Sequence, residues 1–352
     1  HKNLNVPDLR FPEFSGEWVE TELQDIVPNI CSGKDRISNS GEVALYGSTG
    51  VIGRTNSASY KENIVLVARV GANAGQMQIG NAPCGVTDNT LVIDAKEWNY
   101  YIYYFLQHYN LNRLVFGSGQ PLITGGMLKR IKVRYGCKAE RNNITRLLCL
   151  IDERIATQNK IIEDLKLLRD AISGLIFNSM KNEKTILLGN VACISNGSGD
   201  VQDSDSIKRD GWYPFFDRSE EQKWFPTYSF NREAIIYAGE GQNFFPRYYK
   251  GKFALHQRCY AITDFCECLL PKYCLYFMNT LNSYFIRNAV GSTVPSLRMD
   301  MFQKAKIKIP TIERQQEIVS TLDALSLKCE NEEIVRALYN TQKSYLLQQL
   351  FI

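Results

Sequence analysis

The sequence lacks the short motifs that mark most catalytic centres. Its 352 residues contain no G-x-x-x-x-G-K-[ST] phosphate loop, no H-E-x-x-H metal site and no G-x-S-x-G nucleophile turn. The N/D-P-P-Y/F element of an adenine methyltransferase is also missing. The only histidines are His1, His108 and His256, which leaves few candidates for a His-based triad or metal site. These absences disfavour an enzyme.

Long apolar runs and a strong excess of charge are also absent. No run reaches the roughly 18 apolar residues of a membrane helix, and no export signal opens the chain, so we expect a cytoplasmic protein. The formal net charge is only +4 and the pI about 8.4. Because a strongly basic nucleic-acid-binding domain has a pI above about 9, any contact with nucleic acid has to depend on locally placed cations.

Cysteine is not scarce, with 10 in the chain, but the spacing typical of structural zinc sites is missing. The densest group is Cys259, Cys266, Cys268 and Cys274, in which a C-x-C is flanked at longer distances. Structural zinc sites favour ligand pairs with about two to four residues between them. We therefore expect reduced, buried thiols and no metal, with a zinc site as the alternative.

The chain does contain an internal repeat. Residues 117–133 and 291–307 share a Gly-Ser pair, a proline, an apolar pair that begins with Met, and a Lys followed by a β-branched residue, at a constant offset of 174 residues. Between such anchors the halves differ in almost every residue. A duplicated frame with divergent contents predicts one scaffold that presents two recognition surfaces, and two domains of one fold with unrelated roles are the alternative. Pro121 and Pro295 are expected to fix the repeated turn.

Each half has the same expected order of elements. A strand-and-turn region is followed by a short aromatic helix near 98–110 or 271–287, a Gly-Ser-x-x-Pro loop, a strand of alternating Lys and Ile, and a long helix. The predicted fold class is mixed α/β, with two similar globular domains that alternate with two long helices. The expected segments are an N-terminal arm at 1–19, a first domain at 20–136, a central helix at 140–181, a second domain at 184–310 and a C-terminal helix at 312–352.

Apolar residues recur every three or four positions along both long helices, which predicts an antiparallel coiled coil. Gln158 and Arg169 interrupt the first seam, and Glu332, Arg336 and Lys343 interrupt the second, so the C-terminal helix is expected to be marginal alone and to pair with the first. Packing of each helix on its own domain only is the alternative. The expected seam residues are Leu148, Ile151, Ile155, Ile162, Leu165, Ile172, Leu322, Leu325, Leu346 and Leu350.

Three framework segments resemble the specificity subunit of Type I restriction-modification systems. Leu9–Trp18 is similar to the usual start of that family, Ile151–Ile155 to its central conserved region, and Leu347–Phe351 to its C-terminal ending. The resemblance implies two target-recognition domains that each read one part of a split double-stranded DNA sequence, with helices that set the distance between the parts. It also implies partner modification (methyltransferase) subunits, which bind S-adenosylmethionine, a restriction (translocase and nuclease) subunit, and no cofactor in this chain.

Reading DNA requires amide and guanidinium groups for base edges, and cations or hydroxyls for phosphates. The loops of both halves supply such groups, although a solvated loop position is the alternative for each one. The candidates in the first domain are Ser48, Thr49, Arg54, Asn73, Gln76, Asp88, Asn89 and Gln120. The candidates in the second domain are Arg218, Lys223, Asn243, Arg247, Tyr248, Lys250, His256, Gln257, Arg258 and Arg298. Trp18, Trp98, Trp212 and Trp224 are expected to anchor cores or domain seams, with DNA contact as the alternative for Trp212 and Trp224, which lie beside charged loop residues.

The combined expectation is a non-catalytic DNA-recognition subunit of a methylation and restriction complex. The nearest rival is the specificity module of a related split-site system, such as a Type IIB assembly. A coiled-coil adaptor whose globular domains bind protein, and a thiol- or metal-dependent enzyme that uses the cysteine group, are rivals from other classes. Binding that weakens steeply as salt rises would favour the two DNA-reading classes. Protein binding that does not depend on salt would favour the adaptor, and bound zinc would favour the enzyme.

Overall fold

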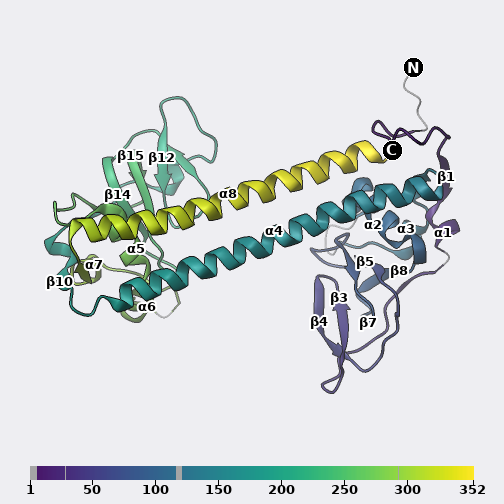
Figure 1. Cartoon of the computed structure of the whole chain (residues 1–352), viewed down its shortest axis with the longest axis horizontal. Helices are drawn as coiled ribbons and strands as arrows, with labels where there is room; N and C mark the ends of the chain where they lie inside the picture. The colour runs from purple at the N-terminus through teal and green to yellow at the C-terminus, as the bar shows by residue number, and fades with distance from the viewer. Residues whose placement is uncertain (1–5, 28, 116–120, 292) are drawn as a thin grey trace. The chain divides into compact units, whose positions relative to one another are not determined.

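Two compact units make up the chain in the computed structural model, which describes residues 6–27, 29–115, 121–291 and 293–352. Unit 1 consists of His1–Asn159 with Ile334–Ile352, and unit 2 consists of Lys160–Glu333. Each unit contains one globular domain and part of the two long continuous helices, α4 (Lys138–Ser179) and α8 (Ile312–Leu350) (Figure 1). No helix in the described part of the chain is both long and apolar enough to cross a membrane.

The domain of unit 1 is built on a four-stranded sheet of order β2-β8-β5-β6, beside a three-stranded sheet of order β4-β3-β7. A separate antiparallel pair, β1 with β9, joins the two ends of the domain. The strands are β1 (Val19–Glu22), β2 (Ile30–Ser32), β3 (Val43–Gly47), β4 (Gly50–Thr55), β5 (Ile64–Ala68), β6 (Met77–Gly80), β7 (Cys84–Val86), β8 (Thr90–Ile93) and β9 (Lys132–Tyr135). The helices are α1 (Leu23–Ile26), α2 (Asn99–Tyr109) and α3 (Gly125–Lys129).

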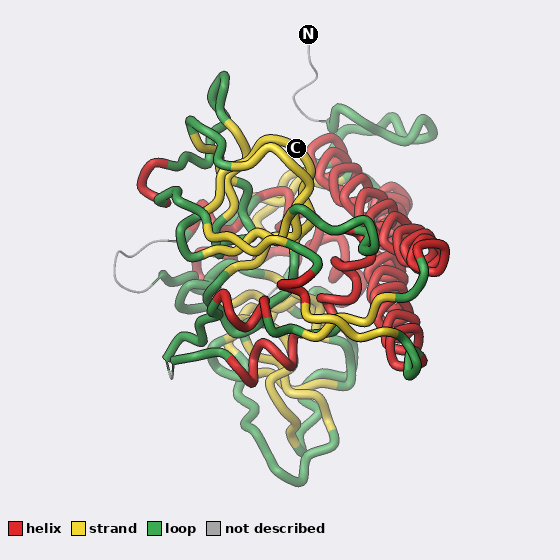
Figure 2. Tube along the Cα trace, turned by 90° about the vertical axis from the view of Figure 1, so that its left-hand side faces the viewer, coloured by secondary structure: helices red, strands yellow, loops and turns green. Residues whose placement is uncertain are grey.

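The domain of unit 2 has one six-stranded sheet of order β11-β16-β14-β15-β12-β13, and its ends are joined by the antiparallel pair β10 with β17. Figure 2 draws the strands in yellow and the helices in red. The strands are β10 (Lys184–Leu187), β11 (Cys193–Asn196), β12 (Tyr213–Phe216), β13 (Lys223–Phe225), β14 (Phe230–Ala238), β15 (Arg247–Leu255), β16 (Cys259–Thr263) and β17 (Lys306–Ile309). The helices are α5 (Pro271–Asn279), α6 (Asn282–Asn288) and α7 (Met299–Gln303). The single aromatic helix expected at 271–287 is therefore two helices, and the first ends with Thr280 as its C-cap residue, whose Oγ1 donates to Phe277 O (2.6 Å).

The two domains share one strand order, which confirms the duplicated frame. The order β2-β8-β5-β6 of unit 1 corresponds to β11-β16-β14-β15 of unit 2. In unit 2, β15 pairs with β14 at its start and runs parallel to β12 at its end. In unit 1 two separate strands make the equivalent pairings, since β6 pairs with β5 and β7 runs parallel to β3. The difference is thus an interruption of one strand at residues 81–83.

A central strand that is buried on both faces organises each domain. In unit 1, Val65 and Val67 of β5 join the core formed with α2, while Ile64 and Leu66 face a smaller core formed with β3 and β7. Alternate residues of a strand point to opposite faces, so a run of apolar residues fits a strand covered on both sides. β14 of unit 2 follows the same pattern, since its alternate residues divide between two cores.

The long helices pair antiparallel within each unit. In unit 1, Asp152 of α4 forms an ion pair with Lys343 (2.6 Å), and Asn159 accepts a hydrogen bond from Arg336 (3.4 Å). In unit 2, Lys166 forms an ion pair with Glu333 (2.6 Å), and Phe177 shares a core with earlier residues of α8 such as Ile318. Residue numbers therefore rise along α4 as they fall along α8. The predicted mixed α/β fold with antiparallel paired helices is confirmed.

All ten expected seam residues are at least partly shielded from solvent. Leu148, Ile151, Leu346 and Leu350 are buried in the core of unit 1, and Ile155 packs against it. In unit 2, Ile172, Leu322 and Leu325 belong to or pack against the main core, Ile162 is buried, and Leu165 is partly buried. Gln158, which interrupts the seam, is also buried.

The aromatic helix of each domain is tied to the long helix that follows it in the sequence. Tyr104 of α2 donates from its hydroxyl to Asp152 of α4 (2.9 Å). Tyr276 of α5 donates in the same way to Asp323 of α8 (2.6 Å). A buried tyrosine hydroxyl needs such a partner, and these bonds fix the rotation of each helix against its domain.

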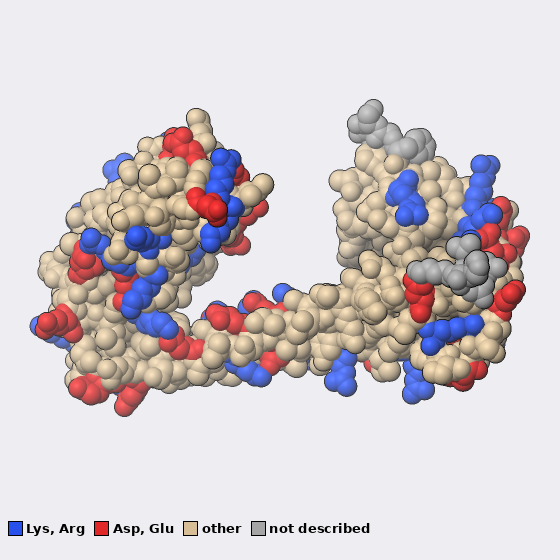
Figure 3. Space-filling view, turned by 90° about the horizontal axis from the view of Figure 1, so that it is seen from above, with Lys and Arg blue, Asp and Glu red and all other residues tan. Residues whose placement is uncertain are grey.

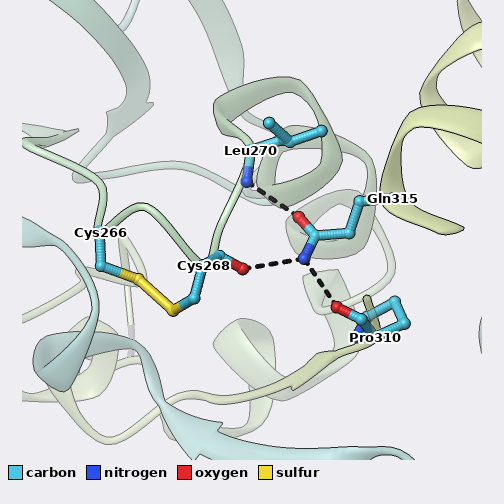
Figure 4. Close-up of a disulfide and its surroundings, with 5 residues drawn as sticks. All are labelled: Cys266, Cys268, Leu270, Pro310 and Gln315. Carbon is cyan, nitrogen blue, oxygen red and sulfur yellow. Dashed lines mark hydrogen bonds between the residues drawn. A yellow bond between two sulfur atoms is a disulfide. The ribbon is translucent and has the colours of Figure 1, made fainter. Parts of the chain in front are cut away.

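The first turn of each long helix is fastened to its domain by one polar side chain. Gln315 of α8 is fully buried; its Nε2 donates to Cys268 O and Pro310 O, and its Oε1 accepts from Leu270 N, all at 2.9 Å (Figure 4). Arg141 occupies the corresponding place in α4. Its guanidinium donates to Gly136 O (3.1 Å) and lies 3.6 Å from the ring centre of Trp98.

Replacing Gln315 by Ala should lower the free energy of unfolding by about 1–3 kcal/mol, because one buried N–H and two buried carbonyls lose their partner. Urea unfolding followed by circular dichroism measures the change. The adjacent Gln316 is exposed on the same helix, and Gln316→Ala serves as the matched control, expected to stay within about 0.5 kcal/mol of the wild type. Equal stability of the two variants would show that the Gln315 bonds do not hold the helix.

Candidate nucleic-acid interface

One turn of each unit occupies the same place in the strand order. Thr87–Thr90 joins β7 to β8 in unit 1, and His256–Cys259 joins β15 to β16 in unit 2. The first N–H of each turn donates to the end of a neighbouring strand, at Tyr46 O (3.0 Å) or Phe216 O (2.9 Å). The last N–H donates back to the first carbonyl of the turn, at 3.2 and 2.9 Å. Backbone bonds form the frame of both turns, and the first side chain of each turn, Thr87 or His256, adds one bond to the backbone. The two middle side chains of each turn are therefore free to differ.

The turn of unit 1 gathers four of the residues expected to contact DNA. Ser48, between β3 and β4, donates from Oγ to Asn89 O (3.2 Å), so the two turns lie against each other. Thr49, Asp88 and Asn89 are exposed there. A hydroxyl, a carboxylate and an amide therefore face solvent at one place.

Among the described residues of unit 1, the structure does not bring the other predicted DNA contacts into this group. Arg54 donates to Glu42 O (2.6 Å) at the far end of the β3–β4 hairpin, away from Ser48. Asn73 and Gln76 lie in the hairpin between β5 and β6, where Asn73 O accepts from Gln76 N (2.9 Å). Gln120 lies outside the described residues.

The turn of unit 2 borders a hollow of about 580 Å³. Five residues predicted as DNA contacts line it together, and they come from the segment after β12, from β13 and from the turn itself. They are Arg218, Lys223, His256, Gln257 and Arg258. Three carboxylates, which sequence reasoning did not single out, line it too: Asp200, Asp217 and Glu240. Figure 3 shows basic and acidic side chains close together on the surface of unit 2.

Two of these cations have carboxylate partners. Lys223 forms an ion pair with Asp217 (2.7 Å), and both side chains are largely shielded from solvent. Arg258 donates from Nη1 to Glu240 (2.6 Å) but remains 66% exposed. His256 accepts at Nδ1 from the backbone N–H of Arg258 (3.2 Å), which leaves its proton on Nε2 as a donor.

Arg247 binds the backbone of the loop that follows β12. Its guanidinium donates to the backbone carbonyls of Ser219 (2.9 Å) and Asp217, and lies 5.3 Å from the ring centre of Phe216. Desolvation by burial lowers the pKa of the guanidinium. Arg247 thus holds the loop that carries Arg218 and Asp217. Its predicted contact with DNA stays a prediction, but the structure directs its donors to the protein.

The remaining candidates of unit 2 lie outside the hollow. The Tyr248 hydroxyl donates to Glu233, with Lys272 Nζ 5.9 Å from the ring centre of Tyr248, and burial raises the pKa of the hydroxyl. Lys250 is exposed on β15, opposite Glu233. Asn243 Oδ1 accepts from Asn282 (3.3 Å).

The same backbone hydrogen bond joins a glycine to the proline of the repeated loop in each unit. In unit 1, Gly71 N donates to Pro121 O (3.0 Å), and in unit 2 Gly241 N donates to Pro295 O (3.1 Å). The role of the prolines in fixing these turns stays a prediction. Asn73 and Asn243 each lie two residues after the glycine, and Arg298 precedes α7 three residues after Pro295.

Three basic residues near the expected interface were not found from the sequence. Arg69 directly follows β5; its guanidinium donates to Ser32 Oγ (3.2 Å), and its backbone N–H donates to Asn89 O (3.0 Å). Lys208 and Arg209 lie over the rings of Trp224 and Trp212, at 4.7 and 4.8 Å from the ring centres. The signal for Lys208 and Arg209 is the pair of tryptophans beside charged loop residues, for which DNA contact is the alternative to a role as core or seam anchors. Both rings are only half-buried.

The cysteine group of unit 2 differs from the expectation of reduced thiols. Cys266 and Cys268 form a disulfide, with Cα atoms 5.3 Å apart (Figure 4), while Cys259 and Cys274 are free and buried. The C-x-C lies in the loop between β16 and α5, which brings the two thiols together. Burial raises the pKa of the Cys259 thiol to about 11 and also raises that of Cys274. Such thiols are poor nucleophiles at neutral pH. The described residues contain no group of three or more metal-ligating side chains.

Comparison with known proteins matches most of the chain. The family model for the Type I restriction modification DNA specificity domain matches residues 15–167 and again residues 180–337. The specificity subunit of the Type I restriction enzyme EcoDI from Escherichia coli is 32% identical over 149 residues, which are 42% of this chain. That match spans only 32% of the length of the relative.

Solved structures share the fold of the whole chain. The S subunit of a Type I restriction-modification system from M. genitalium has a TM-score of 0.69 at 15% identity, with 99% of both chains covered. A chain from a study of complex assembly and conformational transition of the type I R-M system has a TM-score of 0.52 at 12% identity, covering 98% of this chain and 99% of that one. Because the family model matches both halves in turn, the chain belongs to the family of Type I restriction modification DNA specificity domains.

Proposed function

We propose that this chain is the specificity subunit of a Type I restriction-modification complex and reads a bipartite site in double-stranded DNA. The observation that carries the proposal is the pair of equivalent turns with different side chains. Asp88 and Asn89 stand in unit 1 where Gln257 and Arg258 stand in unit 2. One frame with two sets of polar groups suits two different DNA half-sites.

The chemistry of the two turns fits contact with base edges and phosphates. An Asn amide can bond both N6 and N7 of adenine, and an Arg guanidinium can bond O6 and N7 of guanine. Hydroxyls such as those of Ser48 and Thr49, and exposed cations such as Lys250, suit phosphate oxygens. Arg69, Lys208 and the other cations near these surfaces would add sequence-independent affinity.

The proposed partners follow from the family rather than from the described surface. Modification subunits would dock on this chain and bind S-adenosylmethionine, and a restriction subunit would join them for cleavage. The chain itself would hold no cofactor and catalyse no step, and it would act in the cytoplasm. The paired helices α4 and α8 would set the distance between the two recognised half-sites.

Binding of DNA by the complex with modification subunits should weaken steeply as salt rises. A protein that neutralises about six phosphates loses affinity by a factor on the order of a thousand between roughly 50 and 200 mM salt. Fluorescence anisotropy with a labelled duplex measures this slope. An affinity that does not change with salt would contradict DNA reading and favour a protein-binding adaptor.

The purified chain alone should transfer no methyl group to DNA when S-adenosylmethionine is supplied, because its sequence contains none of the catalytic motifs sought. Incorporation of radiolabelled methyl groups into plasmid DNA measures the activity, with the complete complex as the positive control. Sustained transfer by partner-free protein would contradict the proposed non-catalytic role.

Lengthening both helices should widen the gap of the recognised site. One heptad inserted between Asn159 and Lys160, and another between Glu333 and Ile334, keeps the seam in register and adds about 10.5 Å. At about 3.4 Å per base pair, the gap should grow by about three base pairs while the bases of each half-site stay the same. Sequencing of methylated adenines reports the motif.

The matched control carries the sequence of the inserted heptad in place of the seven residues that precede each insertion point, so that the sequence changes and the helix length does not. This control should leave the gap between the half-sites as it is in the wild type. An active insertion variant that keeps the wild-type gap would show that the helices do not measure the DNA.

A further inference from the structure

Arg258 is held in one orientation at the rim of the unit 2 hollow. Its Nη1 donates to Glu240 (2.6 Å), and the Glu240 side chain is only 20% exposed. The opposite edge, Nε and Nη2, has no hydrogen-bond partner among the described residues. That edge carries two parallel N–H donors, and the guanidinium as a whole is mostly exposed to solvent.

The turn that carries Arg258 is rigid. Its N–H groups are bonded on three sides, to Phe216 O (2.9 Å), to Gly199 O (3.1 Å) and across the turn (2.9 Å). The end of β14 packs directly beneath it, since a Cβ built on Gly239 would lie 1.9 Å from Arg258 O. A side chain mounted on such a turn and fixed by a carboxylate loses little freedom when it binds, which favours specific recognition.

The charges around the hollow disfavour a phosphate as its ligand. Arg218, Lys223 and Arg258 contribute three positive charges, and the Asp200, Asp217 and Glu240 carboxylates contribute three negative ones. Phosphate binding depends on a local excess of cations, which three facing carboxylates cancel. The edge of a base carries no net charge and offers both hydrogen-bond donors and acceptors. It therefore suits a lining whose positive and negative charges are equal in number and which also offers both donors and acceptors.

We propose that Arg258 reads a guanine in the major groove, with Nε and Nη2 donating to O6 and N7, and that Glu240 is the positioning residue. Guanine is the base that presents two acceptors side by side on that edge, whereas adenine pairs one acceptor with a donor and thymine offers a single acceptor beside its methyl group. This inference rests on the proposed function, and it names one base of the half-site that unit 2 reads.

The test uses the complex with modification subunits and a pool of duplex DNA of randomised sequence, with methylated adenines and their flanking bases sequenced. The wild-type motif should contain a guanine in one half. Arg258→Ala and Arg258→Lys should both relax that position, with discrimination falling about tenfold to a hundredfold, and should leave the other half unchanged. Lys keeps the charge but cannot form the paired contact.

Arg218→Ala is the matched control, since Arg218 is an exposed cation of the same hollow. Removing this exposed positive charge should weaken binding to all sequences slightly, through reduced long-range attraction to the DNA and without any phosphate bound in the hollow, and should leave the motif unchanged. Glu240→Gln should relax the same position as the Arg258 variants, but less, because the amide is a weaker partner for the guanidinium.

Two results would overturn the inference: an unchanged motif in both Arg258 variants, or full discrimination retained by Arg258→Lys, which would indicate a contact through charge alone. A wild-type complex that selects no split motif would instead contradict the proposed function. Melting curves show whether each variant is folded, and Arg258→Lys gives the decisive result if Arg258→Ala is not.

Discussion

The mutual burial of α4 and α8 is the constraint on which the rest of the structure depends. Both helices have polar stretches in their seams, and a helix in water obtains most of its stability from packing its apolar face. In unit 1, Leu148 of α4 shares a core with Leu346 and Leu350 of α8, and in unit 2 Phe177 shares one with Ile318 and Leu322. Each globular domain therefore completes its core with both helices and cannot be separated from them without exposing apolar surface.

The two units show how one frame can carry two specificities. Backbone bonds shape the turns at Thr87–Thr90 and His256–Cys259 and the repeated proline loops, and the only side chains of the two turns that add to them here are those of the first residues, Thr87 and His256. The fasteners at the first turn of each helix, Arg141 and Gln315, differ in chemistry but occupy the same place. Side chains on the turns can thus change without loss of the fold, and selection for a new DNA sequence can act on them alone.

Local patterns predicted the duplicated frame and the long helices because periodicity and turn chemistry are properties of short segments. The strand interruption at residues 81–83 depends on how β6 and β7 pair with distant strands, and the sequence patterns did not reveal it. The Cys266–Cys268 disulfide is local, but the C-x-C spacing alone did not distinguish it from two reduced thiols. Arg247 illustrates the limit for the site: its basic–aromatic neighbourhood favoured DNA contact, but its donors reach carbonyls 28 and 30 residues away. Asp217 and Glu240 were missed for the same reason, since their importance comes from the cations that folding brings to them.

The central claim is that each globular domain reads its own half-site on a shared frame. The most direct measurement is the methylated motif of a chain in which residues 184–310 are replaced by a second copy of residues 20–136, in complex with modification subunits. The account predicts a split motif with two copies of the half-site that the first domain recognises. An active complex that keeps the wild-type motif, or that reads neither half as before, would contradict it.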